Sequence, residues 1–312
     1  MADAAILGAE LVLGIVLLVK GSDMFVDGAA ALAHRFGISE HLIGLTLVAF
    51  ATSLPELAVS SVASFNGEAG IALGNVVGSN IANICLILGV AALIMTLSPS
   101  GETRRDGLFM VGVAALLALL YAWDRRIDIY DSLIFLGLYA YYIYYLYRAY
   151  LHPRRREKKV TESLPPQDGY AREAVLVGVG AGGVVLGAHW LVEAGVGIAE
   201  WLGISSLVIG LTMVAFGTSI PELASSVAAA LKQRHGIAVG NVIGSNILNV
   251  LLVLGVAGAI RPIGGGDKLV LTLPFLLLVS VLLVVLTRRE IKKWAGVLLL
   301  SLYGVFLALL LV

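Results

Sequence analysis

Apolar stretches separated by short charged or Gly/Pro-rich breaks follow one another along the whole chain. Most of them hold about 18 or more residues, which is enough for a helix to cross the hydrocarbon core of a bilayer. The pattern predicts an all-α membrane protein with ten transmembrane helices. Their approximate limits are 5–33, 42–64, 70–97, 107–123, 129–149, 173–199, 207–231, 237–260, 269–287 and 294–312.

The composition agrees with a chain that faces lipid over much of its surface. Of its 312 residues, 59% are hydrophobic and 13% are charged, whereas a soluble domain carries roughly 25% charged residues. The first apolar run follows Met1 without a preceding Lys or Arg, so it is expected to be a permanent span and not a cleaved signal. The formal net charge of zero gives no reason to expect a nucleic-acid partner, and nothing in the sequence implies a protein partner.

The two halves of the chain carry copies of one segment. Residues 210–260 align with residues 44–94 at a constant offset of 166 without a gap, and 31 of the 51 positions are identical. The matches include Thr, Ser, Pro, Glu, Asn and Gly, which the general bias of apolar helices toward Leu, Val and Ala does not supply. We predict a first five-helix repeat over 1–151, a linker over 152–172 and a second five-helix repeat over 173–312.

An odd number of spans in each repeat has a geometric consequence. If the first repeat crosses the membrane five times, the second begins on the opposite side and must lie inverted, a design known from secondary transporters. Lys and Arg concentrate on the cytoplasmic side of membrane proteins. Placing the linker in the cytoplasm puts 16 Lys and Arg residues inside and four outside. We therefore expect a multi-pass protein of the cell membrane with a cytoplasmic linker and both termini outside.

Two glutamates lie in the middle of predicted spans. Glu56 and Glu222 are flanked on both sides by apolar sequence. An ionised carboxylate inside the membrane is costly and usually marks an ion or proton path. No Lys or Arg lies near them in the spans of the repeated segments, so a permanent salt bridge has no evident partner. We interpret both glutamates as ion ligands.

Each glutamate follows a proline that interrupts its helix. Proline has no amide hydrogen and clashes with the preceding turn, so Pro55 and Pro221 free the carbonyls of Ala51 and Gly217. In hydrocarbon such carbonyls need a partner, which an ion or a water-lined cavity provides. The hydroxyls beside the two breaks are those of Thr52, Ser53, Thr218 and Ser219.

Each copy also carries the polar pattern Gly-Asn-x-x-Gly-Ser-Asn-x-x-Asn, over 74–83 and 240–249. Within each pattern the serine and the last asparagine are four residues apart, so their side chains share a helical face. We expect these pairs, Ser79 with Asn83 and Ser245 with Asn249, to bind a cation. The other asparagines could either ligate the cation or join neighbouring helices by hydrogen bonds. They are Asn75, Asn80, Asn241 and Asn246.

The candidate ligands are all oxygen atoms, from two carboxylates, two amides, at least four hydroxyls and backbone carbonyls. Such a set suits hard cations such as Ca²⁺ and Na⁺ better than zinc or copper. Two negative charges match one divalent ion, and an empty site would carry both charges uncompensated through a low-dielectric barrier. We therefore hypothesise exchange, in which a cation moves in each direction.

These motifs make the sequence resemble the sodium/calcium exchangers of the cation/Ca²⁺ exchanger superfamily, in their compact prokaryotic form. Both signature α-repeats are present, at 44–94 and 210–260, and the resemblance extends over essentially the whole chain. It implies a secondary active antiporter, not an enzyme, that exchanges Ca²⁺ for Na⁺ while spans 1 and 6 slide against the other eight helices. The transported ions are its substrates, and no cofactor is implied.

The resemblance also implies the ligand set of the cation site. The ligands would be the carbonyl of Ala49 with Thr52, Ser53, Glu56, Ser79 and Asn83 from the first repeat, and the carbonyl of Ala215 with Thr218, Ser219, Glu222, Ser245 and Asn249 from the second. Some family members have Asp at the position of Asn249, so this chain has a more symmetric site with one fewer titratable group. The departure leaves open any family property that depends on the Asp, including a proton-bearing middle position.

A Ca²⁺/H⁺ exchanger is the main alternative. In that branch of the superfamily a Glu commonly follows Gly-Asn-x-x, where this chain has Gly78 and Gly244. Glu56 and Glu222 could still exchange protons, so H⁺ stays open as a coupling ion. A channel is not excluded by the sequence. An intramembrane enzyme has no support, because none of the five histidines recurs at a ligand spacing near another.

Other ionisable residues within the predicted spans are interpreted as satisfied pairs or as side chains that reach the interface. Lys20 and Asp23 are three residues apart in the first span and could pair with each other. Asp27, His189 and Glu193 lie on the first and sixth spans, toward an interface.

Overall fold

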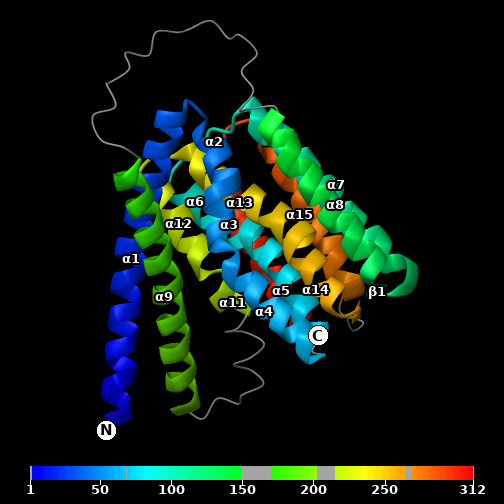
Figure 1. The fold of residues 1–312 in the computed structure, drawn as a ribbon, viewed down its shortest axis with the longest axis horizontal. Coiled ribbons are helices and arrows are strands. Elements are labelled where there is room, and N and C mark those ends of the chain that lie inside the picture. Colours follow the sequence, from blue (N-terminus) through cyan, green and yellow to red (C-terminus); the bar gives the residue numbers. More distant parts are fainter. Residues whose placement is uncertain (1, 68, 149–169, 202–214, 265–268, 312) are drawn as a thin grey trace, which may run out of the picture.

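A computed structural model describes residues 2–67, 69–148, 170–201, 215–264 and 269–311. These residues form a bundle of long helices, shown in Figure 1. In chain order the helices are α1 (Ala2–Phe36), α2 (Glu40–Ile43), α3 (Ala49–Thr52), α4 (Leu54–Asn66), α5 (Ala69–Ala82), α6 (Leu88–Ile94), α7 (Gly101–Asp124), α8 (Ile129–Leu146), α9 (Ala171–Trp201), α11 (Ala215–Thr218), α12 (Ile220–Leu231), α13 (His235–Leu248), α14 (Gly255–Ile260), α15 (Leu269–Leu286) and α16 (Lys293–Leu311). Three π-helical turns, η1 (Gly44–Val48), η2 (Asn83–Ile87) and η5 (Asn249–Leu254), and two strands, β1 (Arg126–Ile127) and β2 (Ile263–Gly264), complete the described elements.

Helices occupy the predicted spans wherever the structure describes them. The span predicted at 207–231 begins outside the described residues. Most of the predicted linker 152–172 also lies outside them. Within the described residues, five helices are long and apolar enough to cross a membrane, or six if the bent pair Glu40–Thr52 and Leu54–Asn66 forms one span. The chain is therefore a mostly helical membrane protein, while ten crossings in two inverted sets stay a prediction.

Both helix breaks that the prolines predict are present. α3 and α4 are separated by Ser53, with a bend of 44° between the two helical arms. α11 and α12 are separated by Ser219. The two serines have nearly the same backbone angles, φ −85° and ψ 8° for Ser53 and φ −88° and ψ 1° for Ser219. Proline is well suited to the first turn of the helix that follows, because its missing N–H would have no partner within that helix.

The two Asn-rich segments lie inside the bundle. Each segment extends over 26 residues, as α5–η2–α6 in the first repeat and α13–η5–α14 in the second. Of the most apolar 18 residues in each segment, 72% and 78% are buried, against 28% for α9. Each contains a π-helical turn, which begins at Asn83 in one repeat and at Asn249 in the other. The sequence pattern did not predict these turns. Such turns occur frequently at functional sites, and both begin at a predicted ligand.

α1 and α9 run side by side along one flank of the bundle (Figure 1). Glycine lets their backbones touch, since a β-carbon at Gly180 would lie 2.5 Å from the backbone nitrogen of Phe25. Small residues that allow such close approach are a main source of helix association in lipid. Arg35 of α1 and Glu173 of α9 add an ion pair at 3.0 Å. The two helices thus form one packed unit.

The ion pairs of α1 correct one prediction. Among the described residues the partner of Asp23 is Lys232, at 3.2 Å, and not Lys20; Lys232 also contacts Asp27 at 2.8 Å. The prediction was wrong because it considered only neighbours on the same helix, whereas packing brings the end of α12 against α1. His189 and Glu193, one turn apart on α9, lie 3.4 Å from each other.

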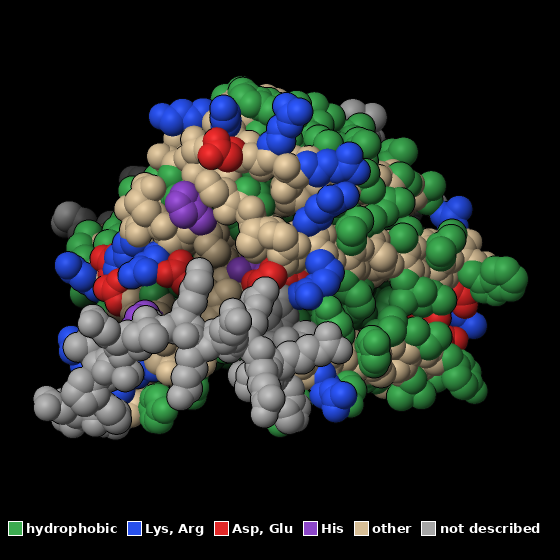
Figure 2. Space-filling model, turned by 90° about the horizontal axis from the view of Figure 1, so that it is seen from above, with side chains coloured by type: hydrophobic (Ala, Val, Ile, Leu, Met, Phe, Trp, Pro, Cys, Tyr) green, Lys and Arg blue, Asp and Glu red, His purple; other side chains and the backbone are tan. Residues whose placement is uncertain are grey.

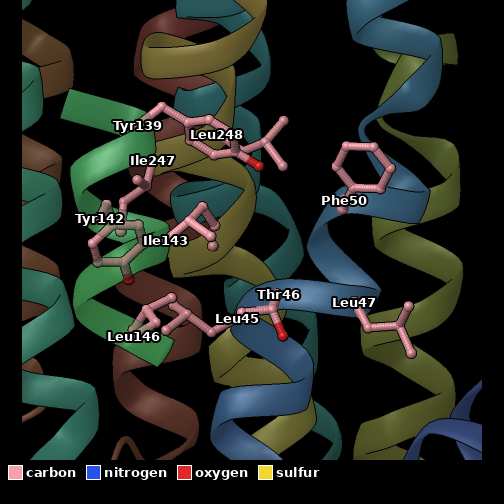
Figure 3. A pocket seen from close by; sticks show the side chains of 11 residues that line it. Leu45, Thr46, Leu47, Phe50, Tyr139, Tyr142, Ile143, Leu146, Ile247 and Leu248 are labelled. Atoms are coloured by element: carbon pink, nitrogen blue, oxygen red, sulfur yellow. The ribbon is translucent and has the colours of Figure 1, made fainter. Parts of the chain in front are cut away.

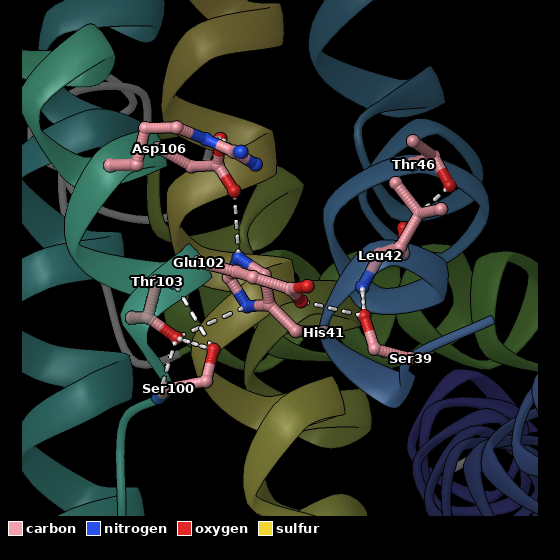
Figure 4. Close-up of polar contacts among 9 residues, drawn as sticks. Ser39, His41, Leu42, Thr46, Ser100, Glu102, Thr103 and Asp106 are labelled. Carbon is pink, nitrogen blue, oxygen red and sulfur yellow. Dashed lines mark hydrogen bonds and ion pairs between the residues drawn. The ribbon is translucent and has the colours of Figure 1, made fainter. Parts of the chain in front are cut away.

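A polar cluster that the sequence did not indicate joins α2 to α7 (Figure 4). His41 and Asp106 are both buried, and Nε2 of the imidazole lies 3.0 Å from Oδ2 of the carboxylate. The hydroxyl of Thr103 lies 3.4 Å from the imidazole Nδ1, and Ser39 donates a hydrogen bond of 2.9 Å to Glu102. The cluster holds the start of the α2–α4 segment against the rest of the bundle.

Figure 2 views the bundle from above, where exposed Lys and Arg side chains are spread over the surface.

Short backbone pairings lie at both ends of α7. β1 pairs antiparallel with β2 just past the last turn of α7, through Ile127 and Ile263. Leu97 pairs with Ile291 just before the first turn. α7 has 24 residues, so the two pairings are about 36 Å apart along its axis. Leu97 and Ile263 are separated by the repeat offset of 166, so equivalent segments of the two repeats make equivalent contacts at opposite ends of the bundle.

Candidate cation site

Glu56 and Glu222 lie in the first turns of α4 and α12, directly after the two serine breaks. Their exposed fractions are 0% and 1%. A helix N-terminus carries a partial positive charge that favours a carboxylate there. In the described parts of the chain no Lys, Arg or His pairs with either side chain. Both carboxylates are thus buried without a cationic partner among the residues that the structure describes.

The serines of the breaks connect the two glutamates across the repeats. Ser53 donates a hydrogen bond of 3.0 Å to Oε1 of Glu222, and Ser219 donates one of 3.3 Å to Oε1 of Glu56. Ser79 of α5 also lies within hydrogen-bond distance of Glu56 Oε1, at 3.5 Å. Each repeat therefore orients the carboxylate of the other, and five predicted ligands lie in two hydrogen-bonded groups, one around each glutamate.

The threonines of the breaks bind asparagines of the opposite repeat. Thr218 donates a hydrogen bond of 3.0 Å to Oδ1 of Asn75, and Thr52 donates one of 3.3 Å to Oδ1 of Asn241. The amide nitrogens of the two asparagines bind within their own repeats, at 3.0 Å to the hydroxyls of Ser60 and Ser226. Asn75 and Asn241 therefore join helices of the two repeats, and each amide oxygen keeps a second lone pair. This is the hydrogen-bonding alternative that the sequence left open.

Several predicted ligands keep a buried oxygen without a hydrogen-bond partner among the described residues. These atoms are Oε2 of Glu56, Oε2 of Glu222, Oδ1 of Asn83, Oδ1 of Asn249 and Oγ of Ser245. Buried polar atoms are nearly always paired, because an unpaired one costs free energy. When both glutamates are ionised, four of the five can only accept, and two carry negative charge. Cations bound there would supply the missing partners, and a divalent ion would balance both negative charges.

The predicted ligands also include two backbone carbonyls, those of Ala49 and Ala215; the structure gives hydrogen-bond contacts for the first only. Ala49 is buried in α3, and its carbonyl accepts the backbone N–H of Ser53 at 3.0 Å and lies 3.4 Å from the hydroxyl of Thr52. A carbonyl has two lone pairs, so further coordination is chemically open. Ala215 is the first residue of α11, directly after residues 202–214, which lie outside the description.

The contacts of the cluster occur in equivalent pairs. Ser53 with Glu222 repeats as Ser219 with Glu56, and Thr52 with Asn241 repeats as Thr218 with Asn75. In every pair the corresponding residues differ by 166 in number. Exchanging the two repeats maps these four contacts onto one another, as a two-fold axis through the cluster would require, whereas the contacts of Ser79 with Glu56 and Ser219 have no counterpart at Ser245 among the described residues. The cluster is shared equally by the two halves of the chain.

Figure 3 shows a pocket with a mostly apolar lining. Its cavity of about 360 Å³ is bordered by η1, α3, α8 and α13 and contains none of the predicted ligands. Leu45, Phe50, Ile143 and Leu248 are among its lining residues, and the hydroxyl of Thr46 is bound to a backbone carbonyl in its own helix. The lining of the pocket contains no carboxylate, so the cluster around Glu56 and Glu222 is the better candidate for a cation site.

The chain is similar to known proteins over most of its length. A family profile described as "Sodium/calcium exchanger protein" matches residues 7–148 and 173–312. The chain is 38% identical to "Sodium/calcium exchanger MaX1" of Methanosarcina acetivorans, with 96% of this chain and 97% of that protein covered. It is 36% identical to "Putative antiporter CaxA" of Alkalimonas amylolytica, with 81% and 80% covered. The solved structure of the sodium-calcium exchanger NCX_Mj soaked with 10 mM Na⁺ and zero Ca²⁺ matches with a TM-score of 0.88 at 32% identity, covering 98% of this chain and 99% of that chain.

Proposed function

Because the chain belongs to the sodium/calcium exchanger family, we propose that it exchanges Ca²⁺ for Na⁺ across the cell membrane by alternating access. Its relatives are transporters, so the chain is an ion antiporter and not an enzyme. The bilayer and the two ions are the partners that this function requires.

The buried carboxylates with unpartnered oxygens carry this proposal. Glu56 and Glu222 each keep one carboxylate oxygen without a hydrogen-bond partner in the described part of the chain, while serine hydroxyls of the opposite repeat bind the other oxygen. Ca²⁺ takes six to eight oxygen ligands from carboxylates, carbonyls, hydroxyls and water, and Na⁺ is also bound by oxygen. The proposed ligands are the twelve residues predicted from the sequence, with one carboxylate from each repeat.

The two carboxylates also give a reason for exchange. If the site crossed between the two sides of the membrane without a cation, it would carry two negative charges buried without a partner, which is costly. Either one Ca²⁺ or several Na⁺ ions would compensate them. A site that can change the side to which it is open only with a cation bound couples the two ion fluxes, as an antiporter requires.

The proposed architecture is ten spans in two inverted repeats, 1–151 and 173–312, joined by the linker 152–172. The reciprocal contacts of the cluster support a two-fold relation between the repeats. The equivalent pairings at the two ends of α7 support inversion, because a repeat that kept its orientation would make them at the same end. The excess of Lys and Arg places the linker in the cytoplasm and both termini outside.

The proposed moving unit is the α1–α9 pair. It is closely packed within itself and lies on the flank of the bundle, next to α12, which carries Glu222, and to α3, which leads to the break before Glu56. Sliding of this pair against the other helices would open the site to one side of the membrane at a time. Lys232 with Asp23 and Asp27 would stabilise one of the end positions.

The coupling ion can be tested with purified protein in liposomes. We expect a Na⁺ gradient at constant pH to drive uptake of radioactive Ca²⁺. A pH gradient without Na⁺ should drive uptake at least about tenfold more slowly, because Gly78 and Gly244 stand where the proton-coupled branch has a carboxylate. Transport driven by the pH gradient alone would instead identify a Ca²⁺/H⁺ exchanger. Ca²⁺ flux without any counter-cation would indicate a channel and contradict exchange.

A further inference from the structure

An asparagine ligand must present its oxygen, and not its NH₂ group, to a cation. The two ends of the amide have nearly the same shape, so packing alone does not select one of them. Asn83 and Asn249 therefore need hydrogen-bond partners that distinguish oxygen from nitrogen. In both cases the partner is an asparagine of the opposite repeat, Asn246 for Asn83 and Asn80 for Asn249.

The orientation of Asn249 follows from a backbone carbonyl. Nδ2 of Asn80 donates a hydrogen bond of 3.2 Å to the backbone oxygen of Asn246. A carbonyl can only accept, so this bond requires the nitrogen of Asn80 and turns its Oδ1 toward Asn249. Oδ1 of Asn80 in turn accepts a hydrogen bond of 3.1 Å from Nδ2 of Asn249. The oxygen of Asn249 is thereby left free, and it is one of the buried unpartnered atoms.

Asn83 is oriented by the equivalent contacts in the other direction. Nδ2 of Asn246 donates a hydrogen bond of 3.3 Å to the backbone oxygen of Asn80, and Oδ1 of Asn246 accepts one of 3.0 Å from Nδ2 of Asn83. Oδ1 of Asn83 is buried and unpartnered as well. All four side chains are at most 2% exposed, so water does not compete for these bonds.

We propose that Asn80 and Asn246 are positioning residues that hold the oxygens of Asn249 and Asn83 toward the transported cation. This inference rests on the proposed function, because it names residues that prepare the same site. The connection crosses between the repeats: Asn80 is three residues from Asn83 but orients Asn249. The π-helical turns begin at the two oriented residues, so each ligand lies where its helix departs from regular geometry.

The alternative role of Asn80 and Asn246 is to fasten α5 to α13 without any effect on the ligands. The two roles differ in how mutations combine. Residues that act through one another give non-additive effects, whereas independent residues give additive ones. The crossed connection supplies a matched control, because Asn80 should couple to Asn249 and not to its near neighbour Asn83.

The test measures half-saturation for Ca²⁺ and the maximal rate in proteoliposomes, with Na⁺-driven uptake. Asn80→Ala and Asn249→Ala should each raise the half-saturation concentration about tenfold, the scale of one hydrogen bond or ligand contact to a charged group. The maximal rate should change less than about threefold, since the ion is bound less well but carried by the same site. The double variant Asn80→Ala/Asn249→Ala should be no weaker than Asn249→Ala alone. The pair Asn80→Ala/Asn83→Ala should be additive, close to the product of the single effects.

The mirrored pair, Asn246→Ala with Asn83→Ala, tests the same inference independently. Additive effects in both crossed pairs, with normal exchange by the wild type, would overturn the positioning role and leave the proposed function intact. Loss of the folded protein in both Asn80→Ala and Asn246→Ala would also overturn it, since the amides would then serve to hold the helices. Absence of Ca²⁺ exchange in the wild type would instead refute the proposed function itself.

Discussion

Replacing either Glu56 or Glu222 by glutamine should reduce Ca²⁺ exchange by at least about 100-fold. Glutamine has nearly the same shape and can still accept the serine hydrogen bonds at Oε1. What it removes is one of the two buried negative charges that face the cation. Breaking a buried ion pair by removing one partner costs about 3–5 kcal/mol, and each 1.4 kcal/mol is a factor of ten in affinity. The equivalent hydrogen bonds of the two glutamates predict similar losses for the two variants.

The measurement is Na⁺-driven uptake of radioactive Ca²⁺ by wild-type and variant protein reconstituted at equal density. Glu102→Gln is a matched control, because Glu102 accepts a hydrogen bond from Ser39 in the α2–α7 cluster and is outside the predicted ligand set. The control should transport at close to the wild-type rate. If both site variants kept more than half of the wild-type uptake, the buried carboxylates would not be the cation ligands.

Gly244→Val should destabilise the folded protein severely. A β-carbon at Gly244 would overlap the carbonyl oxygen of Leu45 and lie 2.8 Å from Cβ of Ala49, so the backbones of α13 and η1 are in direct contact there. Gly240, one turn earlier, is equally close, with 2.5 Å to the carbonyl oxygen of His41. Overpacking usually costs about 1–3 kcal/mol and occasionally more; we expect the upper end, because the clash is with backbone that cannot rotate away.

A thermal melt in detergent measures the effect. Gly244→Val should lower the melting temperature by about 5 °C or more, and it should also abolish transport, because η1 and α3 lead directly to the break before Glu56. Gly112→Val on α7 is the control: no described atom lies within 4 Å of a β-carbon there. A melting temperature for Gly244→Val equal to that of the control would show that α13 and η1 do not pack as described.

Local rules were sufficient to predict the helix breaks and the position of the two glutamates. Pro55 and Pro221 break their helices for reasons contained in two or three neighbouring residues. The exact repetition of the motif then indicated that the two breaks belong to one site. The membership of the chain in its family could be recognised from the same residues, since the polar positions of both α-repeats are specific.

Contacts between distant residues could not be predicted in the same way. Asn80 and Asn246 were equally compatible with ligation and with helix contacts, because the choice depends on which amide lies opposite across the repeat interface. Asp23 pairs with Lys232, 209 residues away, and His41 meets Asp106 from a helix 65 residues further along. The π-helical turns and the two-residue strands carry no hydrophobic period, so the sequence pattern did not indicate them.

Anomalous X-ray diffraction from crystals of the protein grown with Ca²⁺ would locate the bound cation directly. We expect a strong peak between the carboxylates of Glu56 and Glu222, at about 2.3–2.6 Å from oxygens of both, and no comparable peak in Glu56→Gln crystals. A Ca²⁺ peak elsewhere in the bundle, with none between the two glutamates at saturating Ca²⁺, would contradict this expectation.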